Sequence, residues 1–349
     1  MRIEELLAEA RQLNCSDVHL SEGLPISLRQ HGALVPFSET VTSGEVHTLI
    51  LSLCNEAQRE RLLCGQDLDF AWAVSDTERY RVNVYRHRLG LAAAIRILRG
   101  TVPTLEALHL PLVLRTLADQ PNGLILITGP TGSGKSTTLA GMIDYISKHR
   151  NAHIVTVEDP IEYVFSQNQS LIHQREVGET VGSFAGALRS ALREDPDVLL
   201  VGEMRDFETI STVITAAETG HLVLSTLHTT SAAQTIDRIV DTCPPESQQQ
   251  MRTQLSMLLR GVVTQQLLPH ASGKKRVVAC EVLIGTDAVG NLIRENKCHQ
   301  LASQMQAGSA LGMRTMNADL ANLVRTGQIT RERALASTSD GKDLLQYLG

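Results

Sequence analysis

The sequence predicts an α/β protein with two domains: a parallel sheet covered by helices, preceded by a small α+β domain. Three observations support this fold class. After residue 111, short apolar runs alternate with segments of helical spacing, as they do in parallel α/β domains. Before residue 100, short alternating strands accompany amphipathic helices. Residues 100–111 contain a glycine and two prolines, which predicts a linker between domains at 1–99 and 112–349.

The small domain is expected to open with a helix at 3–13, because its leucines recur at helical spacing. A short strand at 18–20 follows. A second helix is expected to carry apolar residues from 46 to 53, with Ser43 as its cap. Residues 69–74 then form another strand. Helices and strands in this order are typical of an α+β domain.

A hairpin is expected to close the small domain. In residues 79–85, apolar and polar side chains alternate, which predicts a half-buried strand with its arginines on the outer face. Arg81 is one of these arginines. Residues 89–98 form the partner strand, which carries Arg96.

The large domain repeats a strand–helix unit. The expected strands are 124–128, 153–157, 198–201 and 222–227, and the expected helices run to residue 149, around 188–192 and through 210–214. Beyond about residue 232 the sequence predicts mostly helix, with a hairpin near 277–284. Ligands of such sheets bind at the carboxyl ends of the strands.

The segment after the first of these strands fits the phosphate-loop pattern G-x-x-x-x-G-K-[ST]. It consists of Gly129, Pro130, Thr131, Gly132, Ser133, Gly134, Lys135, Ser136 and Thr137. A strand precedes it and a helix follows, so a phosphate would lie at a helix N-terminus. Lys135 is expected to contact the β- and γ-phosphates, and the Ser136 hydroxyl is expected to bind Mg²⁺. The nine residues therefore predict a nucleotide-binding site.

An acid follows the strand at 198–201. In P-loop enzymes a carboxylate at this position lies near Mg²⁺ and is usually aspartate. Glu203 is the candidate here, as a catalytic residue and as a magnesium ligand. The alternative is a surface acid that happens to follow a strand.

Three acids follow the strand at 153–157, within Glu158-Asp159-Pro160-Ile161-Glu162. Hydrolysis needs a group that orients and deprotonates a water in line with the γ-phosphate. Glu162 is the candidate catalytic residue, with Glu158 and Asp159 in support. A solvated acidic loop remains the alternative.

His221 and His228 flank the strand at 222–227. A histidine at a strand end is able to sense a γ-phosphate or to relay between subunits. A metal site is a second interpretation, although no H-x-x-x-H spacing occurs here. A structural histidine with satisfied hydrogen bonds is the third.

Stabilising the charge that develops on a transferred phosphoryl group needs a guanidinium, often from a neighbouring subunit. Arg189, Arg193 and Arg205 surround the strand before Glu203, and Arg81 and Arg96 are candidates in the small domain. The sequence does not select among them. A solvated or salt-bridged arginine is the alternative for each.

The composition is that of an ordinary soluble protein, with 42% hydrophobic and 20% charged residues among 349. A net charge of −6 argues against nucleic acid as a partner. The six cysteines contain no C-x-x-C pair, so we expect free thiols rather than a zinc site or disulfides. No apolar run is long enough to span a membrane and no signal peptide is evident, so we expect a cytoplasmic protein.

Five segments carry a family resemblance. They are S-D-V-H-L (16–20), G-P-T-G-S-G-K-S-T (129–137), V-E-D-P-I-E-Y (157–163), A-L-R-E-D-P-D-V-L-L-V-G-E-M-R-D (191–206) and T-A-A-E-T-G-H-L-V-L-S-T-L-H-T-T-S-A (215–232). By these motifs, which extend over nearly the whole chain, it resembles the secretion-ATPase superfamily. Within that superfamily it resembles the type IV pilus retraction ATPases of the PilT type.

The resemblance implies a PAS-like N-terminal domain and a RecA-like ATPase domain with a helical C-terminal region. It implies a homohexamer that uses ATP and Mg²⁺ to power pilus retraction, and hence pilin depolymerisation and twitching motility. The implied roles are Lys135 and Ser136 for phosphate and Mg²⁺, Glu162 as catalytic glutamate, Glu203 as magnesium-motif acid, His221 and His228 as histidine box, and Arg81 and Arg96 as arginines that reach the nucleotide.

Assembly ATPases usually carry a four-cysteine zinc insertion and a long extra N-terminal domain. This chain has neither, which favours the retraction branch. The resemblance then implies an inner-membrane platform protein as partner and a paralogous retraction ATPase as a second partner. It also implies a location at the inner-membrane face of the pilus machine.

One segment departs from the retraction pattern. The hallmark A-I-R-N-L-I-R-E appears as A-V-G-N-L-I-R-E at 288–295, with Gly290 at the arginine position. Family members need this segment for retraction rather than for hydrolysis. A weakly hydrolysing accessory or scaffold subunit is therefore one alternative, and a pilus-assembly or type II secretion ATPase is another. A nucleic-acid translocase is a third alternative, which the acidic charge disfavours.

Overall fold

The structure is a computed structural model that describes residues 2–30, 33–37, 42–75, 78–98, 100–273 and 275–349. Residues 1 and 99, the ends of the first predicted domain, lie outside this set. The chain divides into two units, which are Met1–Val102 with Pro160–Val164 and Pro103–Asp159 with Phe165–Gly349. The short segment Pro160–Val164 thus groups with the first unit, a feature that the domain prediction does not contain.

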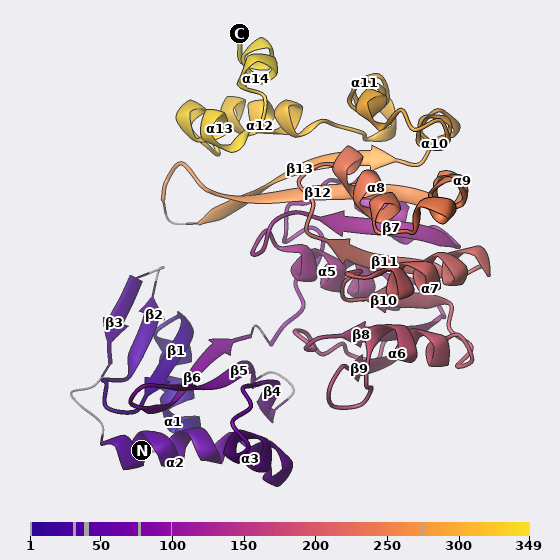
Figure 1. Ribbon diagram of the computed structural model, residues 1–349. Helices are drawn as coiled ribbons and strands as arrows, with labels where there is room; N and C mark the ends of the chain where they lie inside the picture. The colour runs from indigo at the N-terminus through magenta and orange to yellow at the C-terminus, as the bar shows by residue number, and fades with distance from the viewer. Residues whose placement is uncertain (1, 31–32, 38–41, 76–77, 99, 274) are drawn as a thin grey trace. The chain divides into compact units, whose positions relative to one another are not determined.

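The first unit is an antiparallel sheet with its helices on one face (Figure 1). The strand order is β3-β2-β1-β6-β5-β4. Its elements are α1 (Ile3–Gln12), β1 (Cys15–Ser21), β2 (Ser27–Gln30), β3 (Ala33–Pro36), α2 (Ser43–Ser52), α3 (Glu56–Leu63), β4 (Leu68–Ser75), β5 (Glu78–His87) and β6 (Gly90–Ile97). Aliphatic side chains such as Leu6, Val18 and Ile50 fill the core between sheet and helices. The predicted small α+β domain is confirmed.

Two predictions about this unit had different outcomes. Tyr80, Val82 and Val84 are buried on β5, which confirms the half-buried strand. The prediction of Ser43 as the cap of α2 was wrong by one residue. The cap is Thr42, whose side chain accepts the N–H of Glu45, while the Glu45 carboxylate accepts the N–H of Thr42. This reciprocal pair needs an acid three residues after the cap, a spacing that only Thr42 offers here.

The second unit contains a seven-stranded sheet in the order β13-β12-β7-β11-β10-β8-β9. Its strands are β7 (Gly123–Thr128), β8 (His153–Glu158), β9 (Leu171–Glu176), β10 (Val198–Val201), β11 (Leu222–Leu227), β12 (Leu259–Pro269) and β13 (Arg276–Ile284). All neighbours pair in parallel except β13, which is antiparallel to β12. The predicted parallel sheet is confirmed.

Helices cover both faces of this sheet (Figure 1). They are α4 (Val113–Ala118), α5 (Lys135–His149), α6 (Phe184–Ala191), α7 (Phe207–Glu218), α8 (Ala232–Asp241), α9 (Gln248–Leu258), α10 (Asp287–Arg294), α11 (Leu301–Ala307), α12 (Met316–Arg325), α13 (Arg331–Ser337) and α14 (Gly341–Leu348). The helices α6 to α11 share one core with Leu124, Leu126 and Val262. Helices α4 and α5 pack against each other on the opposite face, where Leu117 of α4 contacts Gly261.

The chain beyond residue 232 is mostly helical with a hairpin that includes β13, as expected, but the sequence analysis did not identify β12 as a strand of the parallel sheet. This strand is eleven residues long and pairs in parallel with β7 from Leu259 to Thr264. The preceding helix α9 runs into it without an intervening turn. Leu255, Leu258, Leu259 and Val262 keep a helical spacing across this junction, so the apolar period does not reveal where the helix ends. The sheet, rather than the local sequence pattern, determines the strand.

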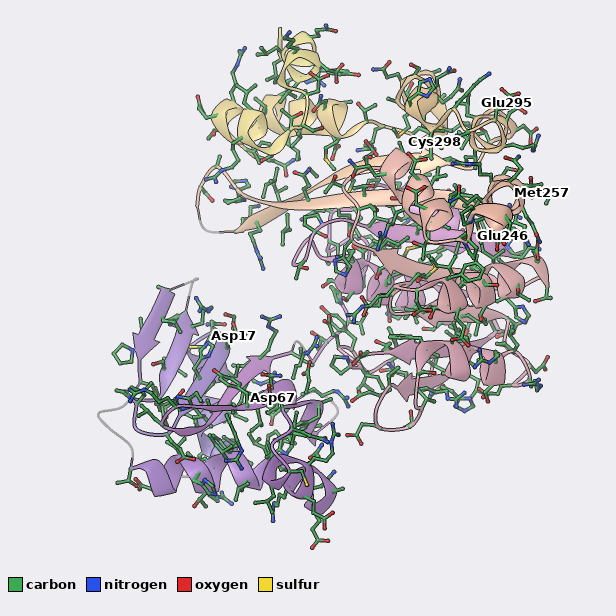
Figure 2. All side chains as sticks on the ribbon, viewed as in Figure 1. Asp17, Asp67, Glu246, Met257, Glu295 and Cys298 are labelled. Atoms are coloured by element: carbon green, nitrogen blue, oxygen red, sulfur yellow. The ribbon has the colours of Figure 1, made fainter. Side chains whose placement is uncertain are left out.

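Among the described residues, no helix is long and apolar enough to cross a membrane. The six cysteines are free thiols, and all except Cys64 are buried. Burial raises the pKa of Cys280 to about 12 and that of Cys298 to about 11. Cys298 lies close to α8 and α10 (Figure 2). Both thiols therefore stay protonated at neutral pH and act as small apolar side chains.

Gly290 marks a close approach of two helices. It lies on α10 and is buried against α9, where a Cβ would come within 2.6 Å of the Ser256 backbone oxygen. Arg294 of the same helix reaches the Ser256 hydroxyl at 3.3 Å. An arginine at position 290, as in the retraction hallmark, would require α10 to move away from α9. The glycine is therefore part of how these helices pack.

We expect Gly290→Ala to destabilise the protein by about 1–3 kcal/mol, because the added methyl group overpacks a backbone contact. The matched control is Gly44→Ala on α2, where a Cβ meets nothing within 4 Å. There the change should be neutral or stabilising, by at most about 1 kcal/mol. Chemical denaturation of the two variants measures the difference. Equal midpoints for the two variants would contradict the packing argument.

Candidate nucleotide site

Parallel strands bring several predicted residues to one edge of the seven-stranded sheet. The strands β7 and β11 end side by side at Thr128 and Leu227, and β10 ends at Val201 beside β11. The phosphate loop follows Thr128, Glu203 follows Val201 and His228 follows Leu227. We refer to the residues that follow β7, β10 and β11 as the phosphate-loop edge.

Glycines give the phosphate loop its backbone shape. Gly129, Gly132 and Gly134 have φ values of 138°, 79° and 95°. A Cβ on Gly129 would overlap the backbone oxygen of Gln265 and lie 2.7 Å from Ser133 Oγ. Gly129 is required by torsion and by space, whereas open space surrounds the Cβ positions of the other two glycines.

Lys135 begins α5 and folds back over the loop. Its Nζ donates to the backbone oxygens of Gly129 at 2.9 Å and Pro130 at 3.1 Å, and the residue is only 8% exposed. Ser133 Oγ is buried and has no hydrogen-bond partner among the described residues. Ser136 is exposed in the first turn of α5. A lysine ammonium, an unsatisfied hydroxyl and a helix N-terminus in one loop fit a phosphate group.

Two side-chain contacts attach the loop to its neighbours. Thr128 Oγ1 lies 2.9 Å from Thr264 Oγ1 of β12, and both residues are buried. On the other face of the sheet, Gln265 Nε2 donates to Thr138 Oγ1 of α5 at 2.8 Å. Sequence analysis missed Thr264 and Gln265, because their strand continued the helical spacing of α9. A signal was available in the β-branched run at 262–264.

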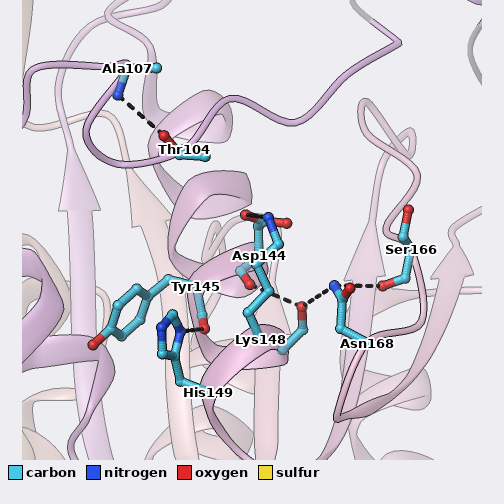
Figure 3. Close-up of polar contacts among 9 residues, drawn as sticks. Thr104, Ala107, Asp144, Tyr145, Lys148, His149, Ser166 and Asn168 are labelled. Atoms are coloured by element: carbon cyan, nitrogen blue, oxygen red, sulfur yellow. Dashed lines mark hydrogen bonds and ion pairs between the residues drawn. The ribbon is translucent and has the colours of Figure 1, made fainter.

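The far end of α5 is also held by polar side chains (Figure 3). Asn168 Nδ2 donates to Ser147 Oγ at 3.0 Å and attaches the helix to the segment before β9, while within the helix Lys148 Nζ donates to Asp144 Oδ2 at 2.8 Å. Basic residues in this last turn also face the negative end of the helix dipole. Attached at both ends, α5 presents its N-terminus to the loop in a defined position.

Glu203 is the centre of a charged cluster at the phosphate-loop edge. Its side chain is 13% exposed and forms an ion pair with Arg205. His228 Nε2 lies 3.6 Å from its second carboxylate oxygen. The Arg205 side chain is 73% exposed. The structure therefore brings three of the predicted residues together, with the carboxylate as the most buried member.

His221 does not belong to this cluster. It precedes β11, whereas His228 follows it, so a strand of six residues, about 20 Å long, separates them. His221 Nδ1 lies 2.8 Å from the Ala216 oxygen, and the His221 backbone oxygen accepts the N–H of Gly123. These contacts connect α7, β11 and β7 at the sheet edge opposite the phosphate loop.

The remaining arginines of this unit make local contacts. Arg189 on α6 forms an ion pair with Glu208 at the start of α7. Arg193 donates to the Arg189 backbone oxygen at 3.1 Å. Arg189 therefore connects α6 to α7 and Arg193 contacts the end of α6, whereas Arg205 contacts Glu203 directly.

In the first unit, Arg81 and Arg96 are neighbours on the adjacent strands β5 and β6. Arg81 binds both oxygens of Asp69, at 3.1 and 2.6 Å. Arg96 Nε donates at 3.0 Å to Asp17 of β1, which is labelled in Figure 2. Both arginine side chains are at least one third exposed. Exposed pairs of this kind stabilise a protein by at most about 1 kcal/mol.

The acidic segment contributes two carboxylates with different surroundings. Glu158 ends β8, and its Oε1 accepts Thr156 Oγ1 at 2.7 Å and Gln174 Nε2 at 3.2 Å. Glu162 is half-buried within Pro160–Val164, the segment that groups with the first unit. Glu158 is therefore engaged in the β8–β9 region, and Glu162 stays the candidate for water activation.

The strand, glycine loop and helix on a parallel α/β sheet define a P-loop ATPase. The family model described as "Type II/IV secretion system protein" matches residues 1–345, and the chain belongs to this family.

Several relatives match over most of their length. The chain is 47% identical to the type IV pilus retractation ATPase PilT of Pseudomonas aeruginosa, over 96% of this chain and 97% of that protein. It is 37% identical to the type IV pilus ATPase PilU of the same organism, over 99% and 90%. The crystal structure of the pilus retraction motor PilT with bound ADP matches with a TM-score of 0.91 and 46% identity, and the match covers 99% of both chains.

We expect Gly129→Ala to weaken nucleotide binding by about 10-fold or more, because a φ of 138° and the contact with Gln265 together impose about 1–3 kcal/mol of strain. Titration of a fluorescent ADP analogue measures the effect. Gly182→Ala is the control, since a Cβ there meets nothing within 4 Å. Wild-type affinity in Gly129→Ala would show that the loop does not bind the nucleotide phosphates.

Proposed function

We propose that this chain is a Mg²⁺-dependent ATPase motor that powers type IV pilus retraction as a homohexamer. The observation that carries the proposal is the complete phosphate loop beside the Glu203 cluster, in a chain 47% identical to a retraction ATPase over 96% of its length. Identity at this level extends over both units rather than over the loop alone.

The phosphate loop and Lys135 bind the nucleotide phosphates. Lys135 Nζ exchanges the backbone oxygens of Gly129 and Pro130 for phosphate oxygens, and the N-terminus of α5 favours the same anion. The Ser136 hydroxyl and Glu203 would hold Mg²⁺, which neutralises charge on the phosphates when bound. His228 orients the Glu203 carboxylate through Oε2, the oxygen opposite the one that pairs with Arg205.

Glu162 orients and deprotonates the attacking water, as the resemblance implies. Arg81 and Arg96 stabilise the charge that develops on the γ-phosphoryl group. Each arginine must exchange a carboxylate oxygen for a phosphate oxygen to do so. Because these pairs are exposed, the exchange costs little free energy. Arg205 is the further candidate, since it already lies at the phosphate-loop edge.

ATP binding and phosphate release then alternate the two units of each subunit between closed and open states. The stroke acts on an inner-membrane platform protein, from its cytoplasmic face, and depolymerises pilin. A paralogous retraction ATPase is the expected second partner. No nucleic acid is expected as a partner, given the net charge of −6.

Gly290 favours one second candidate, an accessory subunit with weak hydrolysis that joins a competent motor. The helix that carries the retraction hallmark is packed tightly on α9 at this residue. An accessory subunit of this kind would keep the phosphate loop and lose the independent stroke.

Purified wild-type protein is expected to hydrolyse ATP and to be a hexamer in size-exclusion light scattering. Glu162→Gln should lower kcat by about 100-fold or more, because general-base catalysis contributes that much. Glu179→Gln, an exposed glutamate in the turn after β9, is the control and should keep the wild-type rate. A hexamer with negligible wild-type turnover would favour the accessory function, and unaffected hydrolysis in Glu162→Gln would remove Glu162 from the mechanism.

Deletion in the native host separates the directions of the motor. Loss of a retraction motor should abolish twitching motility while surface pili remain, because pili are still assembled but are no longer disassembled. Microscopy of surface pili together with a motility assay measures both, and plasmid-borne wild-type protein is the control. Loss of surface pili would instead assign the protein to extension, and normal motility would overturn a role in retraction.

A further inference from the structure

A buried carboxylate lies one strand beyond the contact that anchors the phosphate loop. Glu281 on β13 is 7% exposed. It is the register partner of Thr264 on β12, and Thr264 is the register partner of Thr128. These three residues form one row across the sheet, and Thr128 immediately precedes the loop. Neither the motifs nor the nucleotide site described above uses Glu281.

Glu281 joins the first residues of two helices. Its Oε1 accepts the backbone N–H of Ala232, the first residue of α8, at 2.7 Å. The N–H of Met316, the first residue of α12, also lowers the pKa of this carboxyl group. Both helices also have side-chain caps, Ser231 and Thr315, so Glu281 is an additional acceptor at the start of α8. A negative charge at two helix N-termini is electrostatically favourable.

The start of α8 carries the His228 loop, by which we mean His228–Ser231. Thr229 Oγ1 lies 2.7 Å from Thr235 Oγ1, and Thr230 Oγ1 donates to Gln234 Oε1 at 2.7 Å. These contacts attach the loop to the first turn of α8. A shift of α8 therefore moves His228, whose Nε2 lies 3.6 Å from Glu203.

We propose that Glu281 is a positioning residue of the nucleotide site. It fixes the N-terminus of α8 relative to β13 and α12. Through α8 it fixes the position of the His228 loop, and thereby the contact between His228 and Glu203. This inference rests on the proposed function for its catalytic readout. Burial raises the pKa of Glu281, and the N–H groups of Ala232 and Met316 oppose that shift. Burial thus favours the neutral carboxyl group, whereas the N–H groups favour the carboxylate.

Asp319 is a matched control within the same junction. It lies on α12, is 7% exposed, and accepts the N–H of Cys280 and Arg314 Nη1, each at 2.8 Å. It links α12 to β13, and among the described residues its hydrogen bonds include none to α8. Asp319→Asn thus perturbs the junction without removing the acceptor of the Ala232 N–H.

The test compares Glu281→Ala, Glu281→Gln and Asp319→Asn in the full-length protein. Hydrogen exchange of the backbone amides at 228–236 is the first readout, and it does not need catalytic activity. Glu281→Ala should accelerate exchange there by about 10-fold or more, Glu281→Gln should do so less, and Asp319→Asn should stay within about twofold. Equal exchange in Glu281→Ala and Asp319→Asn would overturn the inference. If Glu281→Ala fails to fold, Glu281→Gln carries the comparison.

ATP turnover is the second readout. Glu281→Ala should lower kcat by about 10-fold while KM for ATP changes by less than about threefold, because the phosphate loop is retained. In a His228→Ala background the same change should add less than about twofold, since both act through one contact. A change in KM alone, or full additivity with His228→Ala, would contradict the proposal. A wild-type protein without turnover would refute the proposed function, and the exchange data would still decide the role of Glu281.

Discussion

The close passage of Gly129 over the backbone oxygen of Gln265 is the constraint on which the phosphate-loop edge depends. Any side chain at position 129 would overlap that oxygen, so the loop is able to pass β12, which runs in parallel beside β7, only with a glycine at this position. The Thr128–Thr264 and Thr138–Gln265 contacts then fix the strand before the loop and the helix after it. The loop is held by the sheet on one side and by α5 on the other.

Among the helix N-termini at this edge of the sheet, those of α5 and α8 differ in the anion available to each. The helix α5 begins within the phosphate loop, beside the buried Ser133 hydroxyl and the Lys135 ammonium. The first N–H of α8 is already bonded to Glu281. A carboxylate provided by the protein thus occupies α8, which favours α5 as the terminus that binds phosphate. The two N-termini would otherwise attract the same ligand.

The sequence predicted the parallel strands and the phosphate loop because apolar runs and glycine spacing are local signals. Glu203 and His228 both directly follow predicted parallel strands, and for this reason they lie at one edge of the sheet. The sequence could not separate His221 from them, because a strand has two ends and only the fold assigns each end to an edge. The strand β12 was missed because Leu255, Leu258, Leu259 and Val262 continue a helical period into the sheet. Thr264 and Gln265 were missed with it, and the contacts of Glu281 were not foreseen although it lies in the predicted hairpin segment 277–284. The β-branched run at 262–264 indicates a strand, but pairing between strands distant in sequence determines that this strand lies beside β7.

The described contacts fall into a buried group and an exposed group. This division suits a site in which some contacts must break and form again repeatedly. The Thr128–Thr264 contact and the Glu281 bond are buried, so breaking them would leave polar groups unsatisfied at a cost of about 1–3 kcal/mol each. The cation–carboxylate pairs of Arg205, Arg81 and Arg96 are instead partly or largely exposed. Such pairs exchange partners at little cost in free energy. The buried bonds therefore preserve the geometry of the scaffold, while the exposed pairs are able to change partners, as the proposed recruitment of a guanidinium group by a phosphate requires.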